Sequence, residues 1–157
     1  MADSPAPLTE GDPAPQVSLP RDGGDIVTLA EISGPVVLYF YPRDDTSGCT
    51  TQALAFTAQR DAFAQAGATI LGVSKDTVAK HEKFAAKHDL AIALLSDAEG
   101  DTCERYGVWV EKKMYGKTFM GIERSTFLIK DGTIRRIWRK VKVPGHVDEV
   151  LAAVRAL

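Results

Sequence analysis

The chain has 157 residues, of which 45% are hydrophobic and 25% charged, and its formal net charge is -2. This length fits one globular domain over residues 1–157, and the charge balance predicts no general affinity for nucleic acid or an anionic membrane. The acidic, proline-rich start lacks the apolar core of a signal peptide, and no apolar run could span a membrane. We therefore expect a cytoplasmic protein.

The N-terminal third predicts an arm, a hairpin and a buried strand. Residues 1–15 are rich in proline and are expected to form an extended arm. Residues 15–29 contain two short apolar stretches around an Asp-Gly-Gly-Asp turn, which predicts a β-hairpin. The run VVLYFY at residues 36–41 is continuously apolar and aromatic, which is typical of a strand buried on both faces.

A long helix is expected next, from near Gly48 to about Gln65, with Gly67 just beyond its end. One stripe of this helix is apolar and includes a cysteine. Its members are Cys49, Ala53, Phe56 and Phe63.

Two further buried strands are predicted at residues 68–74 and 90–96, with an amphipathic helix at residues 76–88 between them. His81 and His88 stand seven residues apart on that helix and share a face. Because no carboxylate or cysteine motif completes a metal site around them, we interpret this face as solvated surface.

The last third predicts a short helix within residues 97–109, irregular sequence over residues 110–120, and a closing helix within residues 143–157. Between them, residues 124–130 and 133–140 form two strands joined by a tight Lys-Asp-Gly-Thr turn. Strands alternating with helices, followed by a hairpin and a helix, indicate an α/β fold with one central mixed sheet flanked by helices.

Two cysteines are too few for a disulfide scaffold. Cys49 and Cys103 are far apart, so the sequence contains neither a CxxC redox pair nor a paired-thiolate zinc site. It also lacks a Walker loop and a GxGxxG motif. We therefore expect no metal and no organic cofactor.

Cys49 lies in the stretch PRDDTSGCT, where a strand ends and a helix begins. Unpaired N–H groups and the helix dipole at a helix start favour a thiolate over a thiol. Gly48 permits a close backbone approach, Thr46 supplies a hydroxyl, and Pro42 provides an apolar wall without an N–H group. A free cysteine is more often a small core hydrophobe, but the polar flanking residues favour a reactive thiol here.

The pattern Pro42-x-x-x-Thr46-x-x-Cys49 resembles the PxxxTxxC signature of peroxiredoxins, cysteine peroxidases built on a thioredoxin fold. Other segments, in matching order, are similar to the bacterioferritin comigratory protein branch of the AhpC/TSA family, also called PrxQ. They are YFYPRDDTSGCT, LGVSKD, LLSD, YGVW, GIERSTFLI and GHVDEVL. The resemblance covers nearly the whole chain and implies a thioredoxin fold of the peroxiredoxin type, with an N-terminal β-hairpin extension.

The resemblance implies a role for each matching residue. Cys49 would be the peroxidatic cysteine, which attacks a peroxide oxygen and becomes a sulfenic acid. Thr46 would hold the thiolate and the incoming oxygen, and Pro42 would shield the sulfenate. Arg124 in GIERSTF matches an arginine that stabilises charge on the leaving oxygen and favours the thiolate. Without the resemblance, Arg124 would be interpreted as a solvated arginine at a strand end.

The chain departs from the family pattern at three positions. Leu54 stands where many members carry a resolving cysteine, and Ser47 stands where proline is common. Gln52 replaces a glutamate that often orients the arginine; its amide can accept a hydrogen bond but carries no charge. Cys103 could be a buried structural thiol, a resolving cysteine within the chain, or a link between two subunits.

These features predict a thiol-dependent peroxidase with a one-cysteine mechanism that reduces hydrogen peroxide and alkyl hydroperoxides in antioxidant defence. An external thiol from thioredoxin, glutaredoxin or glutathione would recycle it, and the protein would be a monomer or weak homodimer. The alternative is a thioredoxin-fold redox sensor or relay that does not turn over repeatedly. Thr46 and Arg124 favour the enzyme, because a sensor does not need to stabilise a leaving oxygen.

Overall fold

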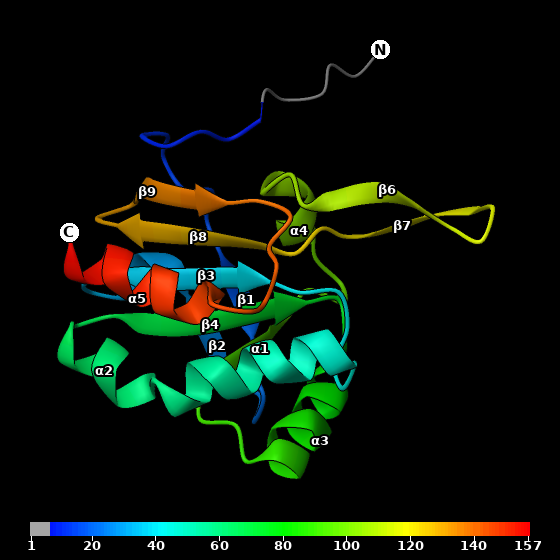
Figure 1. The fold of residues 1–157 in the computed structure, drawn as a ribbon, viewed down its shortest axis with the longest axis horizontal. Helices are drawn as coiled ribbons and strands as arrows, with labels where there is room; N and C mark the ends of the chain where they lie inside the picture. Colours follow the sequence, from blue (N-terminus) through cyan, green and yellow to red (C-terminus); the bar gives the residue numbers. More distant parts are fainter. Residues whose placement is uncertain (1–6) are drawn as a thin grey trace.

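The structure is a computed structural model that describes residues 7–157 (Figure 1). The predicted N-terminal arm therefore lies partly outside the described residues. Its described part runs beside residues 132–134, where the Gly11 amide donates to the Ile134 carbonyl at 2.7 Å and the Ala14 amide to the Gly132 carbonyl at 2.8 Å. No helix in the described part of the chain has the length and apolar character needed to cross a membrane.

A five-stranded mixed sheet forms the centre of the molecule, in the order β5-β4-β3-β8-β9. The first three strands are mutually parallel, and β8 and β9 are antiparallel to their neighbours. The strands are β3 (Val36–Phe40), β4 (Thr69–Ser74), β5 (Ala93–Ser96), β8 (Ser125–Lys130) and β9 (Thr133–Trp138). Every residue of β3 is buried, as its continuous apolar sequence predicts. The predicted α/β fold with a central mixed sheet is confirmed.

Four helices cover one face of this sheet: α1 (Ser47–Ala58), α2 (Arg60–Gln65), α3 (Val78–His88) and α5 (His146–Arg155). In Figure 1, α5 lies in front of the sheet. The aromatic core on this side includes Tyr39, Phe56 and Phe63, and the ring of Tyr39 stacks on that of Phe56 with their centroids 4.6 Å apart. This face therefore carries the stripe that contains Cys49.

The opposite face packs against shorter elements. These are the antiparallel hairpin of β1 (Ser18–Pro20) and β2 (Ile26–Thr28), the 3-10 turn η1 (Leu29–Glu31) and the short helix α4 (Thr102–Arg105). Phe40, Phe127, Tyr106 and Cys103 belong to the core on this side. The predicted N-terminal hairpin and its Asp-Gly-Gly-Asp turn are confirmed.

The helix expected from Gly48 to Gln65 is interrupted. Gln59 leaves helical geometry at φ -101° and ψ 9°, which separates α1 from α2. Its amide donates to the Phe56 carbonyl at 3.1 Å, so the last turn of α1 tightens before the chain continues. The apolar stripe stays buried on both sides of the break, which explains why hydrophobic spacing alone does not reveal it.

The prediction of irregular sequence over residues 110–120 was wrong. Strands β6 (Trp109–Met114) and β7 (Lys117–Ile122) form an antiparallel hairpin that projects from the body of the molecule (Figure 1). Tyr115 and Gly116 at its tip have φ values of 54° and 76°, as a type I′ turn requires. Most of its side chains are exposed, so the sequence lacks the alternation of a half-buried strand.

His146 at the start of α5 should make the fold sensitive to acid. Burial lowers the pKa of this imidazole from 6.5 to about 4, and its Nε2 lies 2.8 Å from Thr126 Oγ1. Between these two pH values the unfolded chain binds the extra proton, so the free energy of unfolding should fall as the pH falls through this range. Chemical denaturation from pH 7 to 4 should show a smaller loss for His146→Gln than for the wild type. Parallel curves for the two proteins would contradict this expectation.

Candidate active site

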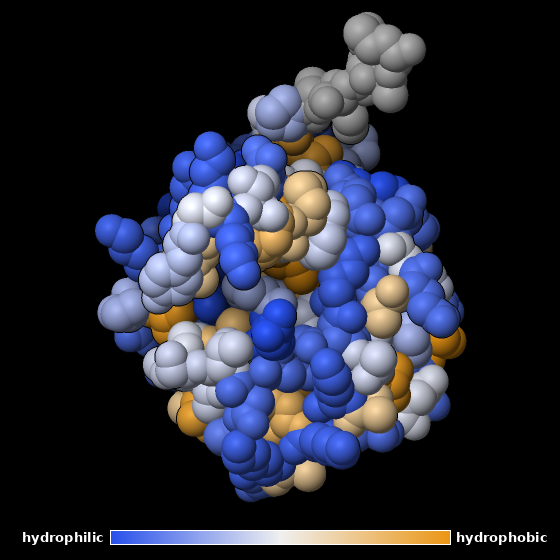
Figure 2. All heavy atoms as spheres, turned by 90° about the vertical axis from the view of Figure 1, so that its right-hand side faces the viewer, coloured by the Kyte–Doolittle hydropathy of each residue, from blue (hydrophilic) through white to orange (hydrophobic). Residues whose placement is uncertain are grey.

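Cys49 lies in the first turn of α1, directly after the loop that follows β3. Thr46 is the N-cap in extended conformation, and its carbonyl accepts the first helical hydrogen bond, from the Thr50 amide at 2.8 Å. The amides of the preceding first-turn residues therefore have no acceptor within the helix. The thiol is only 2% exposed. Figure 2 faces the end of the molecule where α1 begins, and its surface there is mainly hydrophilic with small hydrophobic patches.

Arg124, in the link between β7 and β8, contacts Cys49 directly. Its Nη2 lies 3.3 Å from Cys49 Sγ, and its Nη1 donates to Gln52 Oε1 at 2.5 Å. Gln52 lies one turn beyond Cys49 on α1 and is fully buried. The guanidinium is thus held between the thiol and the amide, in the position where a cation favours a thiolate.

Gly48 leaves the space that the guanidinium occupies. A Cβ atom at this position would lie 3.2 Å from Arg124 Nη2, tighter than nine in ten real contacts of this kind, so the guanidinium would have to give way by a few tenths of an ångström. Glycine therefore suits the close approach between the helix start and Arg124.

Two buried polar atoms near this cluster have no hydrogen-bond partner within residues 7–157, namely Gln52 Nε2 and the hydroxyl of Tyr39. Burial, followed by the charge of Cys49, raises the pKa of Tyr39, which is therefore a neutral phenol. The sequence analysis placed Tyr39 in a buried strand but gave it no place near the thiol.

Thr46 and Pro42 lie in the loop before α1. The Thr46 hydroxyl donates to the Arg43 carbonyl at 3.0 Å, and its side chain is exposed. Among the described residues no hydrogen bond joins this hydroxyl to Cys49, so its predicted contact with the thiolate stays a prediction. Pro42 is half-buried at the end of β3.

The hairpin contributes a second cation that the sequence analysis missed. Lys112 of β6 is half-buried, and its pKa is lowered first by burial and then by the charge of Arg124. The charge of Cys49 acts on it in the opposite direction. Because residues 110–120 were expected to be irregular, nothing in the sequence indicated that Lys112 would lie near the thiol.

Cys103 lies on the other side of the molecule. It is fully buried in α4, in the core on the sheet face opposite Cys49, and both cysteines are free. Its amide donates to Asp97 Oδ2 at 2.8 Å, and burial, then the charge of Asp97, raises the pKa of the thiol. Leu54, at the position where the family resemblance implies a resolving cysteine in many members, is 41% exposed.

The interpretation of His81 as solvated surface was wrong, because this side chain is fully buried. Its Nδ1 lies 2.6 Å from Asp44 Oδ2, and its Nε2 lies 2.8 Å from the Leu95 carbonyl oxygen. Ligand atoms of Asp44, Asp76 and His81 come within 4.8 Å of one another, a spacing that could suit a metal ion. Since both ring nitrogens already have protein partners, we assign no metal to this cluster.

Comparison with known proteins identifies the class. The AhpC/TSA family matches residues 10–137. Peroxiredoxin Bcp of Bacillus subtilis is 48% identical over 147 residues, covering 92% of this chain and 94% of that protein. Peroxiredoxin Bcp of Xanthomonas campestris is 49% identical over 148 residues, covering 92% of each.

Solved structures agree with these sequence matches. The bacterioferritin comigratory protein of Xanthomonas campestris superposes with a TM-score of 0.85 at 48% identity, over 89% of this chain and 90% of that one. A cysteine-to-serine variant of PrxQ from Xylella fastidiosa gives a TM-score of 0.89 at 41% identity, over 95% and 96%.

The chain therefore belongs to the AhpC/TSA family, on the thioredoxin fold of the peroxiredoxins. Its relatives lie in the Bcp branch, also called PrxQ. It is a thiol-dependent peroxidase, with a peroxide as substrate and a thiol as reductant.

Proposed function

We propose that Cys49 is the peroxidatic residue of this enzyme. Its thiolate attacks one oxygen of a hydroperoxide, the S–O bond forms as the O–O bond breaks, and the other oxygen leaves as water or an alcohol after taking up a proton. The sulfur is thereby oxidised to a sulfenic acid and the peroxide is reduced. The observation that carries this proposal is the 3.3 Å contact between Cys49 Sγ and Arg124 Nη2 at a helix start.

Arg124 acts on both sides of this step. Before the reaction its charge, together with the helix dipole, favours the thiolate. During the reaction negative charge grows on the leaving oxygen, and a guanidinium already held in place by Gln52 stabilises it without having to reorganise. Thr46 and Pro42 complete the proposed site, in which the hydroxyl orients the peroxide and the ring covers one side of the sulfenate.

Recycling is proposed to use an external thiol, by a one-cysteine mechanism. A thiol condenses with the sulfenic acid, releasing water and forming a mixed disulfide, and a second thiol then releases Cys49. Thioredoxin, glutaredoxin and glutathione are the candidate reductants. The burial of Cys103 in the core on the opposite sheet face supports this proposal, because two cysteines can pair only when their Cα atoms come within about 7 Å.

Replacing Cys103 should leave catalysis intact. In Cys103→Ser, both the oxidation of Cys49 and the steady-state turnover with excess thiol should match the wild type, because this side chain takes no part in either step. The melting temperature should fall, since the substitution places a hydroxyl in an apolar core. Stopped-flow oxidation and a thermal melt measure both effects. A loss of turnover with unchanged oxidation would instead identify Cys103 as the resolving residue.

The central test is to treat the reduced protein with one equivalent of hydrogen peroxide, trap any sulfenic acid, and map the peptides by mass. A sulfenic acid on Cys49 with Cys103 still a thiol supports the proposal. A disulfide between the two cysteines would overturn the one-cysteine mechanism. Continued peroxide consumption with a thiol supply distinguishes the enzyme from a redox relay, which stops after one equivalent.

Hydrogen peroxide and alkyl hydroperoxides are the proposed substrates. The alkyl peroxide reduction activity described for the Xanthomonas campestris protein supports the second of these. We also propose that the enzyme acts in the cytoplasm as a monomer or weak homodimer, which analytical ultracentrifugation of the reduced and oxidised forms would test.

A further inference from the structure

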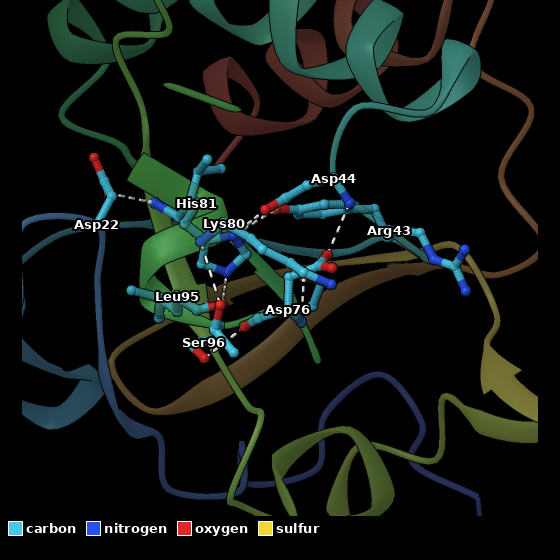
Figure 3. Close-up of polar contacts among 12 residues, drawn as sticks. Asp22, Arg43, Asp44, Asp76, Lys80, His81, Leu95 and Ser96 are labelled. Carbon is cyan, nitrogen blue, oxygen red and sulfur yellow. Dashed lines mark hydrogen bonds and ion pairs between the residues drawn. The ribbon is translucent and has the colours of Figure 1, made fainter. Parts of the chain in front are cut away.

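A buried polar network lies beneath the loop that joins β3 to α1 (Figure 3). At its centre is His81 of α3, whose Nδ1 is 2.6 Å from Asp44 Oδ2 and whose Nε2 is 2.8 Å from the Leu95 carbonyl oxygen in β5. Asp44 belongs to the loop itself and precedes Cys49 by five residues. The ring of His81 therefore connects the loop before the reactive cysteine to α3 and β5.

The contacts define the protonation of this pair. A carbonyl oxygen only accepts, so Nε2 of His81 carries a proton, and Asp44 Oδ1 already accepts from the Tyr41 hydroxyl at 2.6 Å. If His81 is an imidazolium and Asp44 a carboxylate, both ring nitrogens donate, to Asp44 Oδ2 and to the Leu95 carbonyl, and every contact is satisfied. Burial, the largest single effect, lowers the pKa of His81, but the hydrogen bond and charge of Asp44, the Leu95 carbonyl and the charge of Asp76 together raise it overall.

The backbone of Asp44 is held as firmly as its side chain. Its amide donates to Asp76 Oδ2 at 2.8 Å, and the same oxygen accepts from Ser74 Oγ at 2.7 Å. Ser96 Oγ in turn donates to the Asp76 carbonyl at 2.6 Å. Figure 3 shows dashed lines from Asp44 to both the imidazole of His81 and Asp76. Two independent buried contacts thus hold the loop at this one residue.

The next residue makes a similar but exposed pair. Asp45, at φ 60°, places its Oδ2 2.7 Å from Lys87 Nζ and its Oδ1 2.9 Å from His88 Nε2. Solvent screens such pairs, so each contributes little. Because the same helix contacts the same loop through one buried and one half-buried histidine, the chain contains its own matched control.

We propose that His81 is a positioning residue for the peroxide reaction, which holds the loop through Asp44 so that Cys49, in the first turn of α1, stays in contact with Arg124. This inference rests on the proposed role of Cys49. The contact that must be preserved is the 3.3 Å distance between Cys49 Sγ and Arg124 Nη2. Cys49 lies on α1 and Arg124 in the link between β7 and β8, and the loop that contains Asp44 positions only α1. A small displacement of the helix start moves the sulfur away from the cation and from the peroxide.

The first test is the rate constant of Cys49 oxidation by hydrogen peroxide in His81→Gln, a neutral variant that cannot satisfy both partners of the ring. We expect it to fall on the order of ten- to a hundredfold, the usual effect of a slight misplacement of reacting groups. The rate at which an external thiol reduces the sulfenic acid should be unchanged. A variant with a general loss of structure would not keep this rate. His88→Gln should retain the wild-type rate of oxidation.

The second test asks whether His81 acts through Asp44. Asp44→Asn should also slow oxidation, and the double variant should be no slower than the more impaired single variant, because one interaction is lost in each case. The inference is overturned if the rate losses of the two single variants multiply in the double variant. It is also overturned if His81→Gln oxidises at the wild-type rate, or if His88→Gln oxidises as slowly as His81→Gln. If His81→Gln does not fold, an unchanged oxidation rate in Asp44→Asn is sufficient to overturn the inference. A wild-type protein without a Cys49 sulfenic acid would instead contradict the proposed function.

Discussion

Cys49→Ser is expected to lose peroxide turnover, with a fall in the rate constant on the order of 10³-fold or more, because the covalent intermediate can no longer form. Serine differs from cysteine by one atom and fits the same buried position. Its hydroxyl remains protonated beside Arg124, so the cation that favours a thiolate does not create a comparable nucleophile. Peroxide consumption with a thiol supply, followed colorimetrically over time, measures the loss.

The matched control for Cys49→Ser is Cys103→Ser, which makes the same chemical change on the opposite sheet face. Only the first variant should lose activity, and a thermal melt should show both to be folded. If Cys49→Ser turned over peroxide at nearly the wild-type rate, the reacting thiol would lie elsewhere in the protein. That result would contradict the proposed mechanism.

Arg124→Ala is expected to slow the oxidation of Cys49 on the order of 10²–10³-fold, the usual cost of removing one group that stabilises transition-state charge. Two effects combine in this loss. The thiolate loses the cation that lies 3.3 Å from the sulfur, and the leaving oxygen loses the guanidinium that stabilises its negative charge. Stopped-flow kinetics at several peroxide concentrations measure the combined loss.

Arg124→Lys provides the comparison for that experiment. Lysine keeps a positive charge but cannot contact Cys49 and Gln52 through two arms of one planar group, so it should recover only part of the lost rate. Gln52 loses its partner in the alanine variant, and a lower melting temperature is expected there as well. An unchanged rate of oxidation in Arg124→Ala would exclude any role for the guanidinium in the chemistry.

The three parallel strands of the central sheet could be predicted from the sequence because their burial is nearly continuous. β3 is apolar along its whole length, and β4 and β5 are buried in the same way. The helix start at Cys49 was equally visible, through the proline, hydroxyl and glycine residues around it. Short-range features of this kind depend only on residues close together in the chain.

Two other features depend on partners that are distant in the chain. The β6–β7 hairpin was missed because most of its side chains are exposed, so no alternating pattern marks its strands. His81 was placed in solvent because its partner Asp44 is 37 residues away, and only the packing of α3 under the loop brings the two together. Histidine fits a buried site when both ring nitrogens find partners, which the spacing within one helix cannot reveal.

The contact between Cys49 and Arg124 is an intermediate case. Nothing in the local sequence distinguishes Arg124 from a solvated arginine at a strand end, and only the family resemblance indicated that it would approach the thiol. The structure explains how this approach is possible: Gly48 leaves room and Gln52 accepts the second arm. The substitution of glutamate by Gln52 therefore preserves a hydrogen bond while removing a charge.

The separation of the two cysteines across the sheet has a kinetic consequence. Under the proposed mechanism, an oxidised Cys49 has no thiol of its own chain within reach, so two outside molecules compete for it. A reductant returns it to the cycle, whereas a second peroxide converts it to a sulfinic acid and ends its activity. The fraction of enzyme lost in each cycle then follows the ratio of peroxide to thiol in the surroundings, so the working lifetime of the protein depends on the supply of reductant.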